Sequence, residues 1–232
     1  MRRIFAILLA AGVLITYDSW VLLFLSPHPQ PLAGYLSELA ATDQPASWVF
    51  RTGDAVAGTL MLVIAVLGLR GWRSRFGRAS APLAAAIAVT GLATIGDSVA
   101  ALPCTQTFDP ACYAEYTANP LRADFLLHTI ASTIVALAAL ASMVIAVVAL
   151  RRRGRLGTPY GRGVVGMLVL LLVANLASVV IEAVWRSGQG YVQAIAVLII
   201  AAWSAHLGYV AVVGRGEARR SPEERSEVSD AG

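Results

Sequence analysis

The sequence predicts an all-α fold: a polytopic transmembrane bundle of six helices with both termini in the cytoplasm. Two observations lead to this prediction. The 232-residue chain is 57% hydrophobic and only 14% charged, a composition that is unusual for a soluble globular domain. Its apolar residues also form six runs, each long enough to cross about 30 Å of hydrocarbon as a helix rising about 1.5 Å per residue. Helices are expected rather than strands, because unpaired backbone groups are too costly in lipid.

The six predicted spans belong to one transmembrane domain over residues 1–214, and a polar, disordered cytoplasmic tail is expected over 215–232. The first run continues through Tyr17 and Asp18 without a small-residue cleavage site, so we interpret it as a span rather than a secretory signal. The spans are expected at residues 4–25, 53–70, 81–101, 124–150, 163–185 and 191–213.

Arginine supplies all 18 basic residues, and its distribution predicts the orientation of the bundle. Fifteen arginines fall on one face of the six-span arrangement, whereas the other face holds only Arg51, Arg122 and Arg186. The positive-inside rule places the arginine-rich face in the cytoplasm, which predicts a multi-pass protein of the inner (plasma) membrane. The net charge of +4 then reflects topology and contact with membrane lipids, and no nucleic-acid partner is expected.

The outer connections are expected at residues 26–52, 102–123 and 186–190. The first contains GYLSELA, a short amphipathic segment that we expect to lie along the membrane surface. The second contains both cysteines of the chain, Cys104 and Cys112, and we expect a disulfide because this loop faces an oxidising compartment. Two free thiols remain an alternative. A metal or redox pair is disfavoured, since C-x7-C has neither zinc nor thioredoxin spacing.

Ionisable side chains inside the predicted spans are costly in lipid and usually face a partner or a water-filled cavity. Six of them fall at the depth of the outer leaflet, which predicts an outward-facing polar cluster that binds a lipid headgroup or a small cation. The predicted ligand-binding residues are Asp18, Asp54, Asp97, Asp124, His128 and Glu182.

Helical spacing places several of these residues in polar stripes, which are expected to face the bundle interior. Two arginines also stand near acids, so ion pairs are expected between Arg51 and Asp54 and between Glu182 and Arg186. The same pattern would arise if the stripes only hold helices together, at about 0.6 kcal/mol per interhelical hydrogen bond. Packing and ligand binding therefore both remain open. The expected stripes are Thr90, Thr94, Asp97 and Ser98; Asp124, His128 and Ser132; and Asn175, Ser178 and Glu182.

No metal and no cofactor are expected. Helical rise places His128 about 9 Å and His206 about 24 Å below the outer surface, so the two histidines cannot share a zinc ion. A site made of carboxylates and His128 alone would be unusual for zinc. His206 is expected to be a buried histidine whose hydrogen bond comes from a neighbouring helix.

The stretch YLSELAATDQPASWVFRTGDAVAGTLM combines an outer Ser-Glu-Leu segment with a helix that starts with a Gly-Asp pair. The second outer loop places its cysteines before a helix start with Asp124 and His128. In both features the chain resembles the bacterial and archaeal six-helix membrane proteins catalogued as domain of unknown function 998. The resemblance covers about residues 4–213. It implies the six-helix fold and no particular activity.

A looser resemblance is to membrane hydrolases of the alkaline ceramidase and progestin-receptor-like superfamily, which combine a serine, an aspartate and histidines in a helical bundle. Those proteins have seven spans and three metal-binding histidines, including a paired H-x-x-x-H that this sequence does not contain. Because this sequence differs in the number of spans and lacks the paired histidines, the zinc-hydrolase mechanism is not part of the favoured interpretation.

The favoured interpretation is a non-enzymatic membrane protein, and two other functions remain open. A hydrolase acting at the outer leaflet would use His128 as general base, Asp124 to orient it, and Ser132 or Ser98 as nucleophile. A proton-coupled transporter of small solutes would instead use Asp97 and Glu182 as a protonatable pair. The sequence carries no signal for an oligomeric state.

Overall fold

The computed structural model describes residues 1–217, with side chains described up to residue 214. The described residues are helical with no strand, as predicted. Five helical segments are long and apolar enough to cross a membrane. Most of the predicted tail lies outside the described residues, although its first three positions continue the last helix. The five segments are α2 (Ser47–Gly71), α3 with α4 (Arg73–Val99), α6 (Ala123–Arg152), α7 (Pro159–Val184) and α8 (Gln189–Glu217).

The first predicted span is broken, contrary to the expectation of one helix over 4–25. Helix α1 (Arg2–Tyr17) ends at Asp18, and the 3-10 helix η1 (Ser19–Leu25) continues at an angle of 40°. The Asp18 carboxylate accepts a hydrogen bond of 3.1 Å from the indole of Trp20. This bond connects the two sides of the bend. The described chain has six candidate spans if this bent pair counts as one, and five if it does not.

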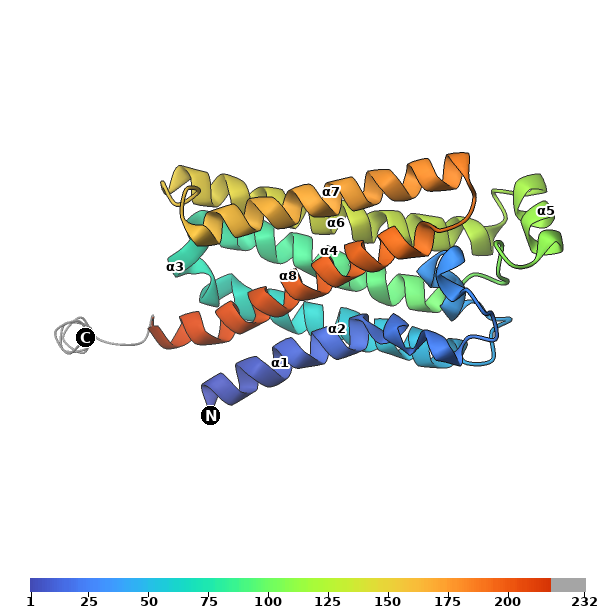
Figure 1. The fold of residues 1–232 in the computed structure, drawn as a ribbon. Helices are drawn as coiled ribbons and strands as arrows, with labels where there is room; N and C mark the ends of the chain where they lie inside the picture. Colours follow the sequence, from blue (N-terminus) through green and yellow to red (C-terminus); the bar gives the residue numbers. More distant parts are fainter. Residues whose placement is uncertain (218–232) are drawn as a thin grey trace, which may run out of the picture.

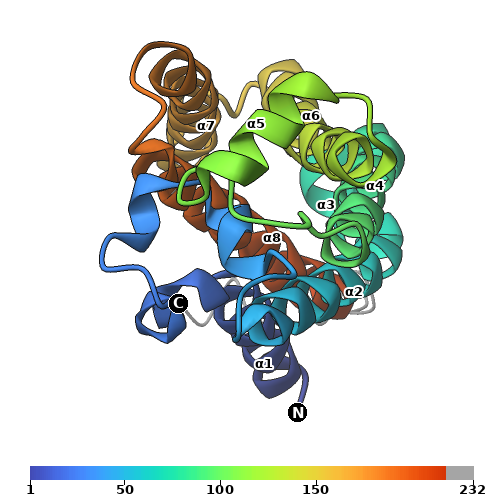
Figure 2. The same cartoon turned by 90° about the vertical axis from the view of Figure 1, so that its right-hand side faces the viewer.

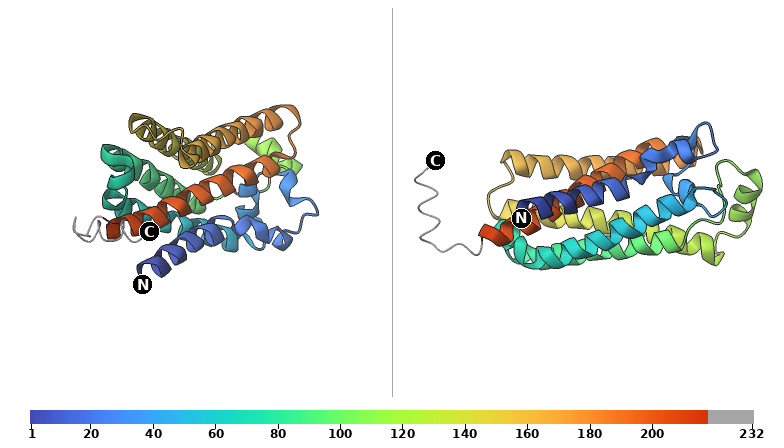
Figure 3. Two further views of the ribbon diagram at one scale, coloured as in Figure 1. Left: turned by 60° about the vertical axis from the view of Figure 1, so that its left-hand side comes forward. Right: turned by 90° about the horizontal axis from the view of Figure 1, so that it is seen from below.

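Helix α8 crosses the bundle diagonally and contacts α1, α2 and α7 (Figures 1 and 3). Helices α2, α4, α6 and α7 pack as successive neighbours around it. The connections at one end carry the short helix α5 (Pro110–Ala118), and we call this the loop end. The opposite end, which we call the turn end, holds α3 (Arg73–Phe76), the connection between α6 and α7, and the start of α1.

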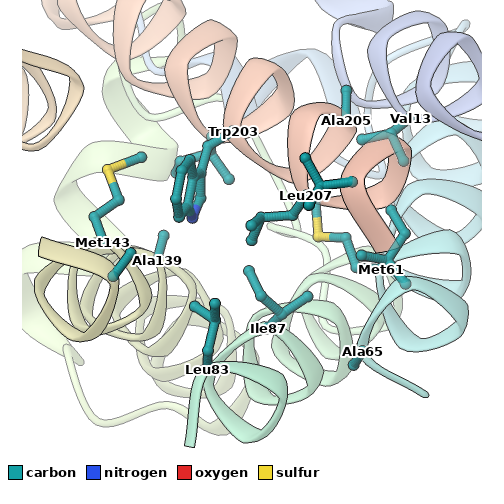
Figure 4. Packing of buried hydrophobic residues seen from close by; sticks show 14 of the residues in the cluster. Val13, Met61, Ala65, Leu83, Ile87, Ala139, Met143, Trp203, Ala205 and Leu207 are labelled. Atoms are coloured by element: carbon teal, nitrogen blue, oxygen red, sulfur yellow. The ribbon is translucent and has the colours of Figure 1, made fainter. Parts of the chain in front are cut away.

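The half of the bundle near the turn end is filled by apolar side chains (Figure 4). Trp203 of α8 is 1% exposed, and its indole nitrogen donates a hydrogen bond of 2.9 Å to Ser142 of α6. Helices α2 and α4 approach closely at Gly58 and Gly91. A Cβ atom on Gly58 would lie 2.5 Å from the carbonyl oxygen of Gly91, and one on Gly91 would lie 2.6 Å from that of Gly58. Small residues allow backbones to pack this tightly in membranes.

The first loop at the loop end folds into the mouth of the bundle, as the end-on view in Figure 2 shows. Its 3-10 helix η3 (Leu36–Ala40) buries Leu36 and Leu39 against Phe50 and Ala194. The apolar side of GYLSELA is therefore directed at the protein, and its position relative to the membrane surface stays a prediction. Its leucines find apolar partners on α2 and α8, so they do not need the lipid surface to be removed from water.

Candidate functional site

A polar cavity of about 150 Å³ lies inside the bundle toward the loop end. We call it the bundle cavity. Helices α1, α2, α4, α6, α7 and α8 and the two 3-10 helices η1 and η3 all contribute to its wall. Its charged lining residues are two aspartates, and no arginine lines it among the described residues. The main polar lining residues are Tyr17, Ser37, Asp54, Thr94, Asp97, Ser132, Asn175 and Gln193.

Asp97 lies at the centre of a cluster that joins α4 to α6. Ser132 donates a hydrogen bond of 2.8 Å to Asp97 Oδ1. His128 Nδ1 lies 3.0 Å from the same oxygen, although the contact is not directed as a hydrogen bond. His128 Nε2 is 3.5 Å from the Ser132 hydroxyl oxygen. The structure therefore brings Asp97, His128 and Ser132 together, with His128 only 7% exposed behind the cavity wall.

The stripe predicted on the third span faces the bundle interior. Thr90, Thr94 and Ser98 on α4 are between 0% and 6% exposed. The hydroxyls of Thr90 and Thr94 donate to backbone carbonyls one turn earlier on their own helix. This part of the stripe satisfies its polar groups locally, and Asp97 is the member that reaches across to another helix.

Asp54 of α2 lines the same cavity as Asp97. Within the described residues, the Asp54 carboxylate forms no hydrogen bond or ion pair. The expected pair with Arg51 is not formed, because the Arg51 guanidinium donates from Nε to the carbonyl oxygen of Ser98 at 2.8 Å. Carbonyls in the last turn of a helix such as α4 lack partners within the helix, so they attract cationic donors.

Asp124 does not belong to the cluster, although one helical turn separates it from His128. Both of its carboxylate oxygens accept hydrogen bonds of 2.7 Å from Arg122, which also pairs with Glu115 of α5. The hydrogen bonds to Asp124 raise the pKa of Arg122. The hydrolase hypothesis assigned Asp124 to orient His128, but the structure places Asp97 beside that imidazole instead.

Asp18 likewise lies outside the lining of the bundle cavity. It is 9% exposed at the break after α1, where it accepts the hydrogen bond from Trp20. Its place in the structure is therefore at the bend of the first span.

Glu182 lies in a second cavity of about 260 Å³, which we call the loop-end pocket. The Gln189 amide donates to the Glu182 carboxylate. The expected ion pair between Glu182 and Arg186 is not formed, and the Arg186 guanidinium lies 5.2 Å from the ring centre of Tyr113. Asp97 and Glu182, the pair required by the transporter hypothesis, thus line different cavities.

Two polar residues that line the cavities were missed by the sequence interpretation. Glu38 is 2% exposed and accepts hydrogen bonds from Thr107 and from the Tyr35 amide, while burial raises its pKa. Gln193 lines the bundle cavity and accepts a bond of 2.7 Å from the Leu36 amide. Signals existed for both. Glu38 is the acid of the short apolar segment LSELA, and Gln193 is an amide inside an apolar run.

His206 lies far along α8 toward the turn end, and its environment confirms the prediction that a neighbouring helix satisfies it. Its Nε2 atom is 3.2 Å from the Tyr160 hydroxyl of α7, and its ring stacks near Trp203. Within residues 1–217, no group of three or more His, Cys, Asp or Glu side chains is arranged to hold a metal.

Cys104 and Cys112 are bonded to each other in the structure, with their Cα atoms 6.0 Å apart. The pair closes the segment between the end of α4 and helix α5. Cys112 is 3% exposed and packs with Leu102 and Phe125. The bridge therefore fixes the second loop on the start of α6.

The model of a family described as "Protein of unknown function (DUF998)" matches residues 9–210. This range includes all lining residues of both cavities. Neither the curated proteins nor the solved structures give a match. The resemblance carried by the Ser-Glu-Leu, Gly-Asp and Asp-x-x-x-His segments is confirmed: the chain belongs to the DUF998 family of proteins of unknown function.

Proposed function

We propose that this multi-pass membrane protein binds a positively charged group in the bundle cavity, either a small free cation or the ammonium of a lipid headgroup. One observation carries the proposal. Asp54 and Asp97 face a common cavity whose lining contains no basic residue. Two carboxylates that share a cavity away from bulk water are costly unless a counter-charge joins them. A bound cation would supply that charge.

The rest of the lining supports a cation rather than an anion. Tyr17, Trp20 and Phe50 contribute aromatic surface, and aromatic faces attract cations electrostatically. The Asn175 amide donates to the carbonyl of Leu171, so its carboxamide oxygen remains as a neutral acceptor in the lining. A cavity of this composition offers a negative charge with several weaker acceptors around it.

We further propose that the loop end faces the outside of the inner (plasma) membrane and that both termini are cytoplasmic. The asymmetry of fifteen arginines against three supports this orientation. Reporter domains fused after Gly214 and within residues 102–123 can test it. We expect cytoplasmic activity from the first and periplasmic activity from the second, and a reversed result would refute the orientation.

The cation proposal can be tested by thermal unfolding of the full chain in lipid nanodiscs. NaCl, KCl or methylammonium chloride would replace N-methylglucamine chloride at constant ionic strength. A bound cation should raise the unfolding midpoint, because a ligand at 100 times its Kd stabilises by about 2.7 kcal/mol. We expect at least one of the three salts to give this shift.

A matched pair of variants makes the test specific. Asp54→Asn removes a cavity carboxylate that has no hydrogen-bond partner among the described residues, so it should abolish the shift without loss of folded protein. Asp124→Asn removes an equal charge from the half-exposed pair with Arg122 outside the cavity and should leave the shift intact. An unchanged shift in Asp54→Asn, or no shift with any salt, would reject the proposal.

A second candidate function is a hydrolase at the outer leaflet, favoured by the arrangement of Asp97, His128 and Ser132. Contacts of 3.0 and 3.5 Å connect aspartate to imidazole and imidazole to hydroxyl, the order that nucleophilic serine chemistry requires. In the structure, however, the hydroxyl donates to Asp97. Catalysis would need Ser132 to rotate toward His128 first, which is why this function ranks second.

An activity-based probe can decide whether Ser132 is a nucleophile. We would treat the protein in nanodiscs with a fluorophosphonate and identify labelled residues by mass spectrometry. Labelling of Ser132 that disappears in His128→Gln would establish the hydrolase. An unlabelled Ser132 would reject it and leave the cation proposal untouched.

A further inference from the structure

The loop-end pocket is built from three parts of the chain that meet above the bundle cavity. The first loop contributes Tyr35 and Glu38, the segment leading into α5 contributes Thr107, and α5 itself contributes Tyr113. The junction of α7 and α8 contributes Glu182, Arg186 and Gln189. The 3-10 helix η3 contributes Leu36, Ser37 and Ala40 to the bundle cavity and Glu38 to the loop-end pocket. No described residue lines both cavities, so the two sites are distinct.

One side of the loop-end pocket has an acceptor that lacks a donor. Gln189 is 1% exposed, and its amide nitrogen donates to Glu182. Its Oε1 atom is buried with no hydrogen-bond partner among the described residues. Leaving a buried acceptor unpaired is costly, so a donor from outside the chain would stabilise this arrangement. The neighbouring Glu182 carboxylate favours a donor that carries positive charge.

Glu38 does not compete for that donor. Its two carboxylate oxygens already accept hydrogen bonds from the Thr107 amide and hydroxyl and from the Tyr35 amide. The buried acceptor of the loop-end pocket without a partner among the described residues is Gln189 Oε1, and the Glu182 carboxylate lies beside it.

The other side of the pocket has a cation that lacks an anion. Arg186 is exposed, its guanidinium lies over the Tyr113 ring, and it forms no ion pair among the residues whose side chains are described. Its planar fork of donors suits a carboxylate or phosphate.

The backbone at Arg186 gives an independent reason to assign a role to its side chain. Arg186 follows the end of α7 with φ of 54°, the left-handed conformation in which helices commonly place glycine. A side chain is unfavourable there, whereas glycine is not. The chain holds an arginine at a position whose backbone geometry favours glycine.

From these observations we propose that the loop-end pocket binds a molecule with a primary ammonium and an anionic group a few atoms apart. The ammonium donates to Gln189 Oε1 and Glu182, and the carboxylate or phosphate accepts from Arg186. Free amino acids and the phosphoethanolamine headgroup of a lipid share this chemistry. The proposal is independent of cation binding in the bundle cavity.

Three soluble probes and one lipid identify the ligand chemistry and its source. The full chain in phosphatidylcholine nanodiscs would be titrated with glycine, O-phosphoethanolamine and phosphocholine while its unfolding midpoint is measured. We expect a rise with glycine or phosphoethanolamine and at least tenfold weaker binding of phosphocholine, whose quaternary ammonium has no N–H. A rise seen only in nanodiscs that contain phosphatidylethanolamine assigns the pocket to the lipid headgroup.

Arg186→Gly is the decisive variant, because it removes the guanidinium and relieves the backbone at once. We expect a midpoint equal to or above that of the natural protein without ligand, together with at least a tenfold loss of affinity. Glu182→Gln, which retains an acceptor for Gln189, should also lose at least tenfold. Asp54→Asn should leave this binding unchanged, which separates the two sites.

The proposal is overturned if neither the soluble probes nor the ethanolamine lipid shifts the midpoint. It is equally overturned if Arg186→Gly and Glu182→Gln both bind as the natural chain does, or if phosphocholine binds as tightly as phosphoethanolamine.

Discussion

Ser132 on α6 donates a hydrogen bond of 2.8 Å to Asp97 on α4, and this bond joins two helices at the wall of the bundle cavity. The same aspartate oxygen lies 3.0 Å from His128. An acid that faces both a cavity and a neighbouring helix can serve packing and binding together. The sequence left these two roles as alternatives, and the structure gives Asp97 the interhelical contact and a place at the cavity wall.

The packing role of this bond can be measured by replacing Ser132 with alanine. We expect Ser132→Ala to lower the free energy of unfolding by about 0.6 to 1.5 kcal/mol, the usual range for one such bond. Equilibrium unfolding of the protein in mixed micelles would measure the change. Ser187→Ala, at an exposed position, should change stability little. Equal effects of the two substitutions would show that the bond to Asp97 does not stabilise the bundle.

The close approach of α2 and α4 predicts opposite effects for two glycine substitutions. Gly58→Ala should destabilise by about 1 to 3 kcal/mol, because its Cβ would meet the Gly91 carbonyl oxygen and force the helices apart. Gly96→Ala, on α4, meets nothing within 4 Å and should be neutral or stabilising by up to about 1 kcal/mol. Thermal unfolding of both variants provides the check. Stabilisation by Gly58→Ala would contradict the packing described here.

The burial of Glu38 predicts a pH dependence of stability. Burial raises the pKa of this carboxyl above its ordinary value of 4.5, and the hydrogen bonds from Thr107 only partly oppose the shift. The folded state therefore holds the proton more tightly than the unfolded state. The resulting stability is fully present below about pH 4.5 and is lost as pH rises through the folded pKa.

Comparing the natural chain with Glu38→Gln isolates this contribution. Unfolding midpoints would be measured from pH 4 to pH 8, and the stability of the natural chain relative to the variant should decrease as the pH rises. A constant difference between the two proteins would mean that Glu38 ionises equally well in both states.

The bonded cysteines predict a specific labelling pattern. Cys104 and Cys112 should resist alkylation in intact cells and react after treatment with a reductant, since the loop end is proposed to face an oxidising compartment. Loss of the bridge in a Cys104→Ser, Cys112→Ser variant should cost roughly 2.5 kcal/mol by the chain-entropy argument. Alkylation without reductant would rule out the bridge in the cell.

Hydrophobic run length was sufficient to predict where the long helices lie. The runs expected at 53–70 and 124–150 fall within α2 and α6, and the run expected at 163–185 ends one residue beyond α7. The break at Asp18 was not predictable from run length, because η1 is as apolar as the spans and the run continues across the bend. The folding of η3 into the bundle mouth depends on contacts with Phe50 and Ala194, which are distant in sequence.

The candidate site was predictable in part, because the position of a residue along a predicted span gives its depth in the membrane. Membrane depth identified Asp54 and Asp97 as neighbours, and helical spacing identified His128 and Ser132. Membrane depth alone could not predict that Glu182 lines a different cavity from Asp97. The cavity that a side chain faces also depends on the rotation of its helix about the helix axis. Asp124 was misassigned because Arg122, only two positions away, binds both of its oxygens.

The break after α1 has a consequence for how the first span crosses a bilayer. Helix α1 has 16 residues and spans about 24 Å, whereas α7 has 26 residues and spans about 39 Å. The hydrocarbon thickness is about 30 Å, so α1 alone falls short, and a complete crossing would need the apolar residues of η1 beyond the bend. Tyr17 and Ser19, on either side of Asp18, line the bundle cavity. The wall of the cavity thus includes the point at which the first span changes direction.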